Sequence, residues 1–167
     1  MALDRLFTYG TLLPDLVRPP MDALVARLTP LGPATVPGQL YDLGPYPGMV
    51  LNHGIASVVR GEIFELPQDP AVLSALDDYE GSCLYRRVEC RATTPNGDTT
   101  RCWVYECYAD LSRAIVIPDG DYRSWHEKKN DSSARVTLRA QHAARATSSS
   151  ARGCPRRVRP ATCGPTA

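Results

Sequence analysis

Three carboxylates crowd the end of a segment that the sequence predicts to be a helix: Asp77, Asp78 and Glu80. Acidic side chains usually lie near helix N-termini, because the unpaired carbonyls of the C-terminus carry partial negative charge. The helix dipole, the neighbouring carboxylates and the adjacent Tyr79 are expected to raise the proton affinity of Glu80. Such a group can both accept and donate a proton near neutral pH, so Glu80 is a candidate general acid/base. For Asp77 or Asp78 alone, a solvated surface turn is the better interpretation.

A second pattern that could do chemistry is Tyr9-Gly10-Thr11-Leu12, where a predicted strand gives way to a glycine turn. Consecutive backbone N–H groups in such a turn form a nest that binds an anion without any charged side chain. A ligand carboxylate is the simplest anion for it. A strand that merely turns at Gly10 explains the pattern equally well, so the motif alone does not decide.

Motifs for metal and nucleotide chemistry are missing from the sequence. The six cysteines contain no C-x-x-C pair, and the three histidines lie far apart in the chain. A zinc site is therefore not expected. Neither a P-loop nor a G-x-G-x-x-G motif occurs, so no nucleotide cofactor is indicated. The sequence predicts a site that works without metal or cofactor.

The 167 residues divide into two parts of different charge. Residues 1–126 hold 10 arginines and 16 acidic side chains, a formal charge of −6. Residues 127–167 hold 9 basic and 2 acidic side chains, a charge of +7, and no aromatic residue. A segment of that composition has little with which to build a core. We expect a folded domain over residues 1–126 and a disordered basic tail over 127–167.

The basic tail allows three interpretations. It is a solvated extension without function, an arm that contacts nucleic acid or an acidic partner, or the product of an altered reading frame. Nucleic-acid binding by the tail is expected to be weakly specific, because the tail offers no aromatic side chain for stacking on bases. No apolar run is long enough to span a membrane, and the N-terminal residues do not resemble a signal peptide,. A cytoplasmic protein with reduced cysteines is expected.

Short strands and two helices must position these motifs. Apolar and β-prone runs predict strands at residues 6–9, 58–66, 84–92 and 100–108, and only short or bulged strands between residues 34 and 50,. Apolar spacing predicts a helix over residues 21–28. Asp69 and Pro70 form a helix start and Gly81 a stop, which predicts a helix over 70–80. The class is α+β, with a small closed or partly closed β-barrel as the expected architecture.

The two strands at residues 84–92 and 100–108 flank an Asn-Gly pair, which predicts a hairpin with a two-residue turn. That register sets Arg87 opposite Glu106 and Cys90 opposite Trp103. Cys90 and Cys102 then point to opposite faces of the hairpin, so no disulfide is expected between them.

Several motifs, in order along the chain, resemble the gamma-glutamylcyclotransferase-like family. Each motif is short, but their order and spacing together cover essentially residues 4–126 and none of the tail. The motifs are Phe7-Thr8-Tyr9-Gly10-Thr11-Leu12, Val36-Pro37-Gly38-Gln39-Leu40-Tyr41-Asp42-Leu43, Val59-Arg60-Gly61-Glu62-Ile63-Phe64, Leu76-Asp77-Asp78-Tyr79-Glu80-Gly81, Leu84-Tyr85-Arg86-Arg87 and Asp119-Gly120-Asp121-Tyr122-Arg123.

The resemblance implies a small β-barrel with outer helices and a site for a small γ-glutamyl substrate. It implies that the backbone of Tyr9, Gly10, Thr11 and Leu12 binds the substrate α-carboxylate, and that Glu80 is the catalytic acid/base. The implied reaction is intramolecular cyclisation, which releases 5-oxoproline and a free amine without metal or cofactor.

Two tyrosines and the activity itself are left open by the resemblance. Tyr85 and Tyr105 lie near the site in family members, where they contact substrate or only pack in the core. The alternative to an enzyme is a member of the same fold that binds a small metabolite without turnover. The sequence does not determine the leaving amine or the oligomeric state.

Overall fold

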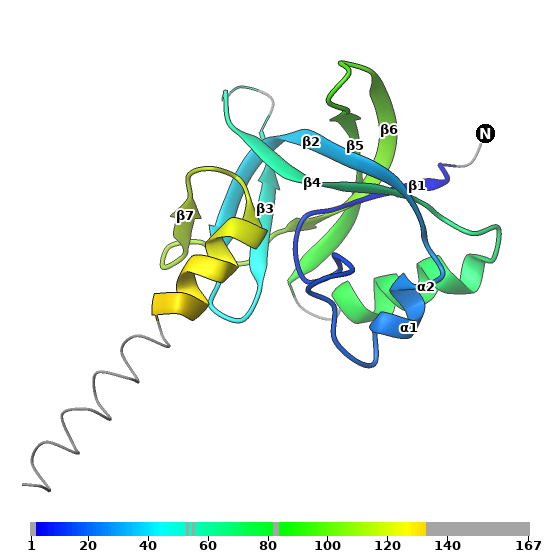
Figure 1. The fold of residues 1–167 in the computed structure, drawn as a ribbon, viewed down its shortest axis with the longest axis horizontal. Helices are drawn as coiled ribbons and strands as arrows, with labels where there is room; N and C mark the ends of the chain where they lie inside the picture. Colours follow the sequence, from blue (N-terminus) through cyan, green and yellow to red (C-terminus); the bar gives the residue numbers. More distant parts are fainter. Residues whose placement is uncertain (1–2, 53, 55, 82–83, 133–167) are drawn as a thin grey trace, which may run out of the picture. The chain divides into compact units, whose positions relative to one another are not determined.

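The computed structural model describes residues 3–52, 54, 56–81 and 84–132 of the chain. Figure 1 shows the arrangement of its strands and helices. The elements in chain order are β1 (Arg5–Thr8), α1 (Asp22–Val25), β2 (Thr29–Asp42), β3 (Pro47–Leu51), β4 (Val58–Glu65), α2 (Pro70–Glu80), β5 (Tyr85–Thr93), β6 (Thr99–Cys107) and β7 (Ile115–Ile117).

Five strands close into a barrel in the order β2-β4-β1-β6-β5, and Thr35 of β2 pairs with Thr93 of β5 to complete it. β1 lies in the middle of this order, antiparallel to β4 and parallel to β6. The second half of β2 pairs instead with β3 and β7 (Figure 1). The expected α+β fold with a small β-barrel is confirmed. Closure removes the open sheet edges that strands of this kind would otherwise expose.

The apolar side chains form two layers, and β1 contributes to both. Phe7 belongs to a cluster with Val36, Val59 and Val104 from the surrounding barrel strands. Its neighbour Leu6 belongs to a second cluster, in which Phe64, Val25, Leu28, Val72 and Leu76 lie between the barrel and the two helices. Successive residues of a strand point to opposite faces, so Leu6 and Phe7 are buried on opposite sides of β1,. This packing fixes α2, and with it the acidic segment at its end.

The region before and along β2 differs from the prediction. α1 is a single turn, not a helix over residues 21–28, although its predicted apolar residues Met21, Val25 and Leu28 are buried. β2 is a strand of 14 residues rather than a set of short ones. Gly32, at φ 121°, takes up a register shift between β2 and β4. The prolines of β2 are tolerated because along residues 29–37 it pairs continuously only with β4,.

The register of the β5–β6 hairpin is one residue away from the predicted one. Gly97, at φ 89°, is the last residue of a three-residue loop. Asn96 before it does not have a positive φ, like every other described residue that is not glycine. A two-residue Asn-Gly turn would need positive φ at both central positions. The longer loop sets Arg86, not Arg87, opposite Glu106, and the two form an ion pair at 3.0 Å.

The corrected register also changes the environment of two cysteines. Cys90 and Cys102 are cross-strand partners on the same buried face, with their Sγ atoms 3.5 Å apart. The prediction that they point to opposite faces was wrong, because it rested on the two-residue turn. Both are free thiols in the structure, as is Cys107, so the expected thiol state agrees for these three. Cys83 lies outside the described residues.

Residues 122–132 are helical, which the sequence analysis did not predict. Asp121 starts this helix by accepting hydrogen bonds from the backbone and hydroxyl of Ser124 at 3.3 and 3.0 Å,. This helix runs past residue 126, where the folded domain is predicted to end, and the division into a domain and a tail stays a prediction. The rest of that tail lies outside the described residues. No helix in the described part of the chain is long and apolar enough to cross a membrane.

Candidate active site

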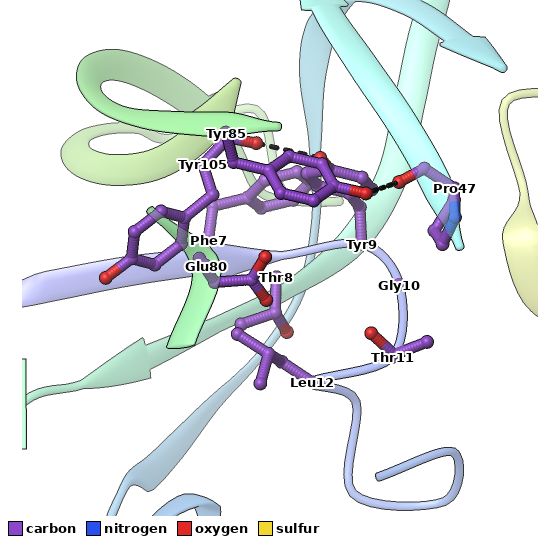
Figure 2. A pocket seen from close by; sticks show the side chains of 10 residues that line it. All are labelled: Phe7, Thr8, Tyr9, Gly10, Thr11, Leu12, Pro47, Glu80, Tyr85 and Tyr105. Atoms are coloured by element: carbon purple, nitrogen blue, oxygen red, sulfur yellow. Dashed lines mark hydrogen bonds between the residues drawn. The ribbon is translucent and has the colours of Figure 1, made fainter. Parts of the chain in front are cut away.

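A pocket opens where β1 ends and the loop after it begins, and Figure 2 shows the side chains around it. β1, β3, α2, β5 and β6 all contribute to its wall. The lining residues are Phe7, Thr8, Tyr9, Gly10, Thr11, Leu12, Pro47, Glu80, Tyr85 and Tyr105. The structure thus brings together every residue that the sequence analysis assigned to the site.

Glu80 is the last residue of α2, and its carboxylate faces the loop of residues 9–12 (Figure 2). Burial raises the pKa of the Glu80 carboxyl from its ordinary 4.5 to about 7,. No described residue forms a hydrogen bond or ion pair with this carboxylate, so no described group offsets its desolvation. The direction agrees with the expectation from the sequence, but the cause is burial rather than crowding by Asp77 and Asp78.

Asp77 does not add to the negative charge at Glu80, because it is neutralised by its own partners. Arg87 forms an ion pair with Asp77 at 2.6 Å, and the Tyr105 hydroxyl donates to its other oxygen at 2.9 Å. The guanidinium of Arg87 also lies 4.8 Å from the centre of the Trp103 ring. These contacts tie the end of α2 to β5 and β6 and so hold Glu80 over the pocket.

The loop that follows β1 presents its backbone to the pocket. Within the described residues, the N–H groups of Gly10, Thr11 and Leu12 donate to no other protein group, whereas the Gly10 carbonyl accepts from Leu13 at 2.9 Å. The loop passes so close to β3 that a Cβ atom on Gly10 would lie 2.4 Å from Cγ of Pro47. Only glycine fits at this position. Three consecutive N–H groups without a protein acceptor agree with the nest interpretation,.

The three tyrosines line the pocket but use their hydroxyl protons within the protein. Tyr9 donates to the Tyr105 carbonyl at 2.7 Å, and Tyr85 donates to the Pro47 carbonyl at 2.8 Å. Tyr105 donates to Asp77, as described above. Burial raises the pKa of each phenol above its ordinary value. Their rings therefore shape the pocket wall, and each hydroxyl oxygen is left with acceptor capacity only.

Thr8 is a pocket residue whose role the sequence analysis missed. It is 3% exposed, and its Oγ1 is the buried side-chain oxygen or nitrogen that lacks a partner within the described part of the chain. A buried hydroxyl without a hydrogen bond is unfavourable, and native proteins rarely keep one unless a ligand or water completes it. The polar side chain that follows the apolar pair Leu6-Phe7 at the end of β1 was the available sequence signal.

The pocket is narrow and adjoins a wider cavity. Its volume is about 30 Å³, enough for about one water molecule,. The adjoining cavity, of about 410 Å³, shares Thr11, Glu80 and Tyr85 with it. A ligand larger than water can occupy the inner pocket only if side chains at its rim move. No group of three or more His, Cys, Asp or Glu side chains in residues 3–132, leaving aside the masked gaps at 53, 55 and 82–83, is placed to bind a metal.

Solved structures with the same fold come from bacteria and animals. YkqA from Bacillus subtilis is 21% identical with a TM-score of 0.61 over 78% of this chain, which spans only 43% of that protein. An AIG2-like protein from Mus musculus is 21% identical with a TM-score of 0.58, covering 73% of this chain and 89% of that one. The protein ytfP from Escherichia coli is 29% identical with a TM-score of 0.52, covering 71% and 95%.

A comparison with curated proteins found no match. The sequence profile of a family described as gamma-glutamyl cyclotransferase, AIG2-like, matches residues 6–124, which include every residue of the pocket. The chain therefore belongs to the AIG2-like gamma-glutamyl cyclotransferase family.

Proposed function

We propose that this protein cyclises a γ-glutamyl amine or peptide to 5-oxoproline and releases the free amine, with Glu80 as general acid/base. The observation that carries the proposal is the position of Glu80, a carboxyl with a pKa of about 7 that faces three unused backbone N–H groups. Membership of the family supports this class of reaction. The substrate is a small molecule, and the chain's own residues supply all the groups that the steps below use.

The free N–H groups of Gly10, Thr11 and Leu12 are assigned to the substrate α-carboxylate. Three consecutive backbone donors without a protein acceptor suit an anion, and charge-assisted hydrogen bonds to a carboxylate are stronger than those to a neutral group,. With the carboxylate held there, the adjacent α-amine lies towards Glu80, which approaches the loop from the end of α2 (Figure 2). Thr8 is the pocket hydroxyl without a protein partner, and we assign it to contact the bound glutamyl group.

In the first chemical step, the Glu80 carboxylate takes a proton from the substrate α-amine as its nitrogen attacks the γ-carbonyl carbon. A new C–N bond closes a five-membered ring and leaves a tetrahedral intermediate. In the second step, the bond from that carbon to the original amide nitrogen breaks, and Glu80 returns the proton to the departing amine. A pKa near 7 suits both transfers,. The ring closure is intramolecular and gains from proximity.

The proposed setting is the cytoplasm, where thiols remain reduced. The free thiols of Cys90, Cys102 and Cys107 support this setting,. Nucleic acid has no part in the proposal, since the steps concern only the pocket.

The proposal is tested by replacing the acid/base without changing its shape. Glu80→Gln keeps the volume and the hydrogen-bonding capacity but cannot transfer a proton, so kcat should fall by about 10² to 10⁴. Glu65→Gln, at an exposed position on β4, is the matched control and should leave kcat unchanged. The assay is release of 5-oxoproline from a panel of γ-glutamyl amines and peptides. Normal turnover by the Gln variant would remove Glu80 from the mechanism, and binding without turnover by the wild type would favour the non-catalytic alternative.

A further inference from the structure

The outer cavity beside the inner pocket has a lining of its own. Besides the three residues it shares with the inner pocket, the described residues that line it are Tyr46, Asp78, Tyr79 and Leu84. Tyr46 and Tyr79 expose 44% and 43% of their surface, which is unusual for aromatic side chains without a partner to cover them,. These residues do not line the inner pocket, and Asp78 and Leu84 face only the outer cavity among the pockets described.

The proposed reaction, on which this inference rests, gives the outer cavity a place in catalysis. The γ-glutamyl group enters the inner pocket as side chains at its rim move, and the amine that it loses is bonded to the carbon beside Glu80. Because Glu80 borders both cavities, the leaving amine must extend into the outer one. The walls of the outer cavity therefore contact the part of the substrate that differs from one γ-glutamyl compound to another.

The charge of the outer cavity is negative. Asp78 is exposed and forms no ion pair with any described residue, in contrast to Asp77, which Arg87 neutralises. Of the described residues, no lysine, arginine or histidine lines this cavity. Arg18 and His126 line a neighbouring cavity, which shares Tyr46 and Tyr79 but not Asp78. A positive group that lies against Asp78 therefore meets a carboxylate and two aromatic rings together.

We propose that the outer cavity binds the leaving amine and selects amines that carry a second positive charge on an alkyl arm. Tyr46 and Tyr79 provide ring faces, which attract cations and also pack against methylene groups. Asp78 provides the opposite charge at the cavity wall. A leaving group with a carboxylate in the same place meets repulsion from Asp78 and is a poorer substrate.

Three conjugates of matched length separate charge from size. They are the γ-glutamyl derivatives of 1,4-diaminobutane, n-butylamine and 4-aminobutanoate, whose free ends are positive, neutral and negative. The expected order of kcat/KM for the wild type is diamine, then butylamine, then aminobutanoate, with the diamine preferred over butylamine by about tenfold at low salt. Added salt should reduce this preference, because the pair with Asp78 is exposed.

Asp78→Asn tests which residue is responsible. It should lower kcat/KM for the diamine conjugate about fivefold and leave the butylamine conjugate unchanged, because only the charge of the free end contacts Asp78. Asp98→Asn, in the exposed β5–β6 loop, makes the same change in net charge away from the cavity and should change neither value. A loss that is equal for both conjugates in Asp78→Asn would indicate a general effect on the site and would overturn the inference.

The outcomes separate this inference from the proposed function. If all three conjugates release 5-oxoproline at equal rates and Asp78→Asn changes none of them, the cyclisation stands and the charge selection is wrong. If no conjugate is turned over, the proposed function fails, and the Kd of each conjugate for the protein decides the inference instead. A preference for the diamine that depends on Asp78 supports it, and equal Kd values contradict it.

Discussion

Glu80→Gln is expected to make the protein more stable above neutral pH, in addition to its effect on activity. Folding raises the pKa of the Glu80 carboxyl from 4.5 to about 7, so the folded state binds this proton more tightly than the unfolded state. The stability that the protonated group contributes is complete below the unfolded pKa. This stability is lost as the pH rises from about 4.5 to above 7, where the carboxyl is ionised in both the unfolded and the folded state,.

The size of this effect follows from the two pKa values. One pKa unit corresponds to about 1.4 kcal/mol, so the free energy of unfolding should fall by about 2.5 kcal/mol from this group between about pH 5 and about pH 8. The Gln side chain is neutral at both pH values and does not contribute such a loss. The advantage of Glu80→Gln over the wild type should therefore grow by about 2.5 kcal/mol over that interval.

Urea unfolding at the two pH values measures the difference directly. The wild type, Glu80→Gln and the surface control Glu65→Gln are compared, and the control should follow the wild type at both pH values. If Glu80→Gln and the wild type showed the same pH dependence, the Glu80 carboxyl would titrate normally in the folded protein. Burial would then not tune this carboxyl for proton transfer.

Two further substitutions test the geometry of the inner pocket. Gly10→Ala places a Cβ atom 2.4 Å from Cγ of Pro47, which forces the loop to move by about 1 Å, so kcat/KM should fall about 10²-fold,. Gly54→Ala is the control, because the nearest described atom to its Cβ would be 3.6 Å away, and its kcat/KM should equal that of the wild type. Thr8→Val removes the buried hydroxyl without changing the shape of the side chain, so kcat/KM should fall about tenfold while the melting temperature stays equal or rises,. A lower melting temperature with unchanged kcat/KM would give Thr8 a structural role only.

Local signals made the position of Glu80 predictable. Asp69 accepts a hydrogen bond from the Ala71 N–H at 3.0 Å, and the helix it starts ends at Gly81, as the sequence indicates. β1 ends before Gly10, so the strand and the turn after it were also predictable. These features depend on residues close together in the chain.

Features that depend on distant contacts were not predictable from the sequence. The register of the β5–β6 hairpin depends on whether the loop that ends at Gly97 has two residues or three, and the short-range pattern does not distinguish these lengths. Asp77 on α2 is neutralised by Arg87 of β5, a tertiary contact, so the sequence could not show that crowding by Asp77 is not what raises the pKa of Glu80. The unpartnered hydroxyl of Thr8 becomes apparent only when the whole pocket is assembled.

The identity of the products tests the central claim most directly. The wild-type protein is incubated with a γ-glutamyl amine, and the products are separated and quantified with time. Intramolecular attack by the α-amine predicts 5-oxoproline and free amine in equal amounts, with no free glutamate. Release of glutamate in place of 5-oxoproline would show that water attacks the γ-carbonyl, and it would contradict the role assigned to the substrate amine and Glu80.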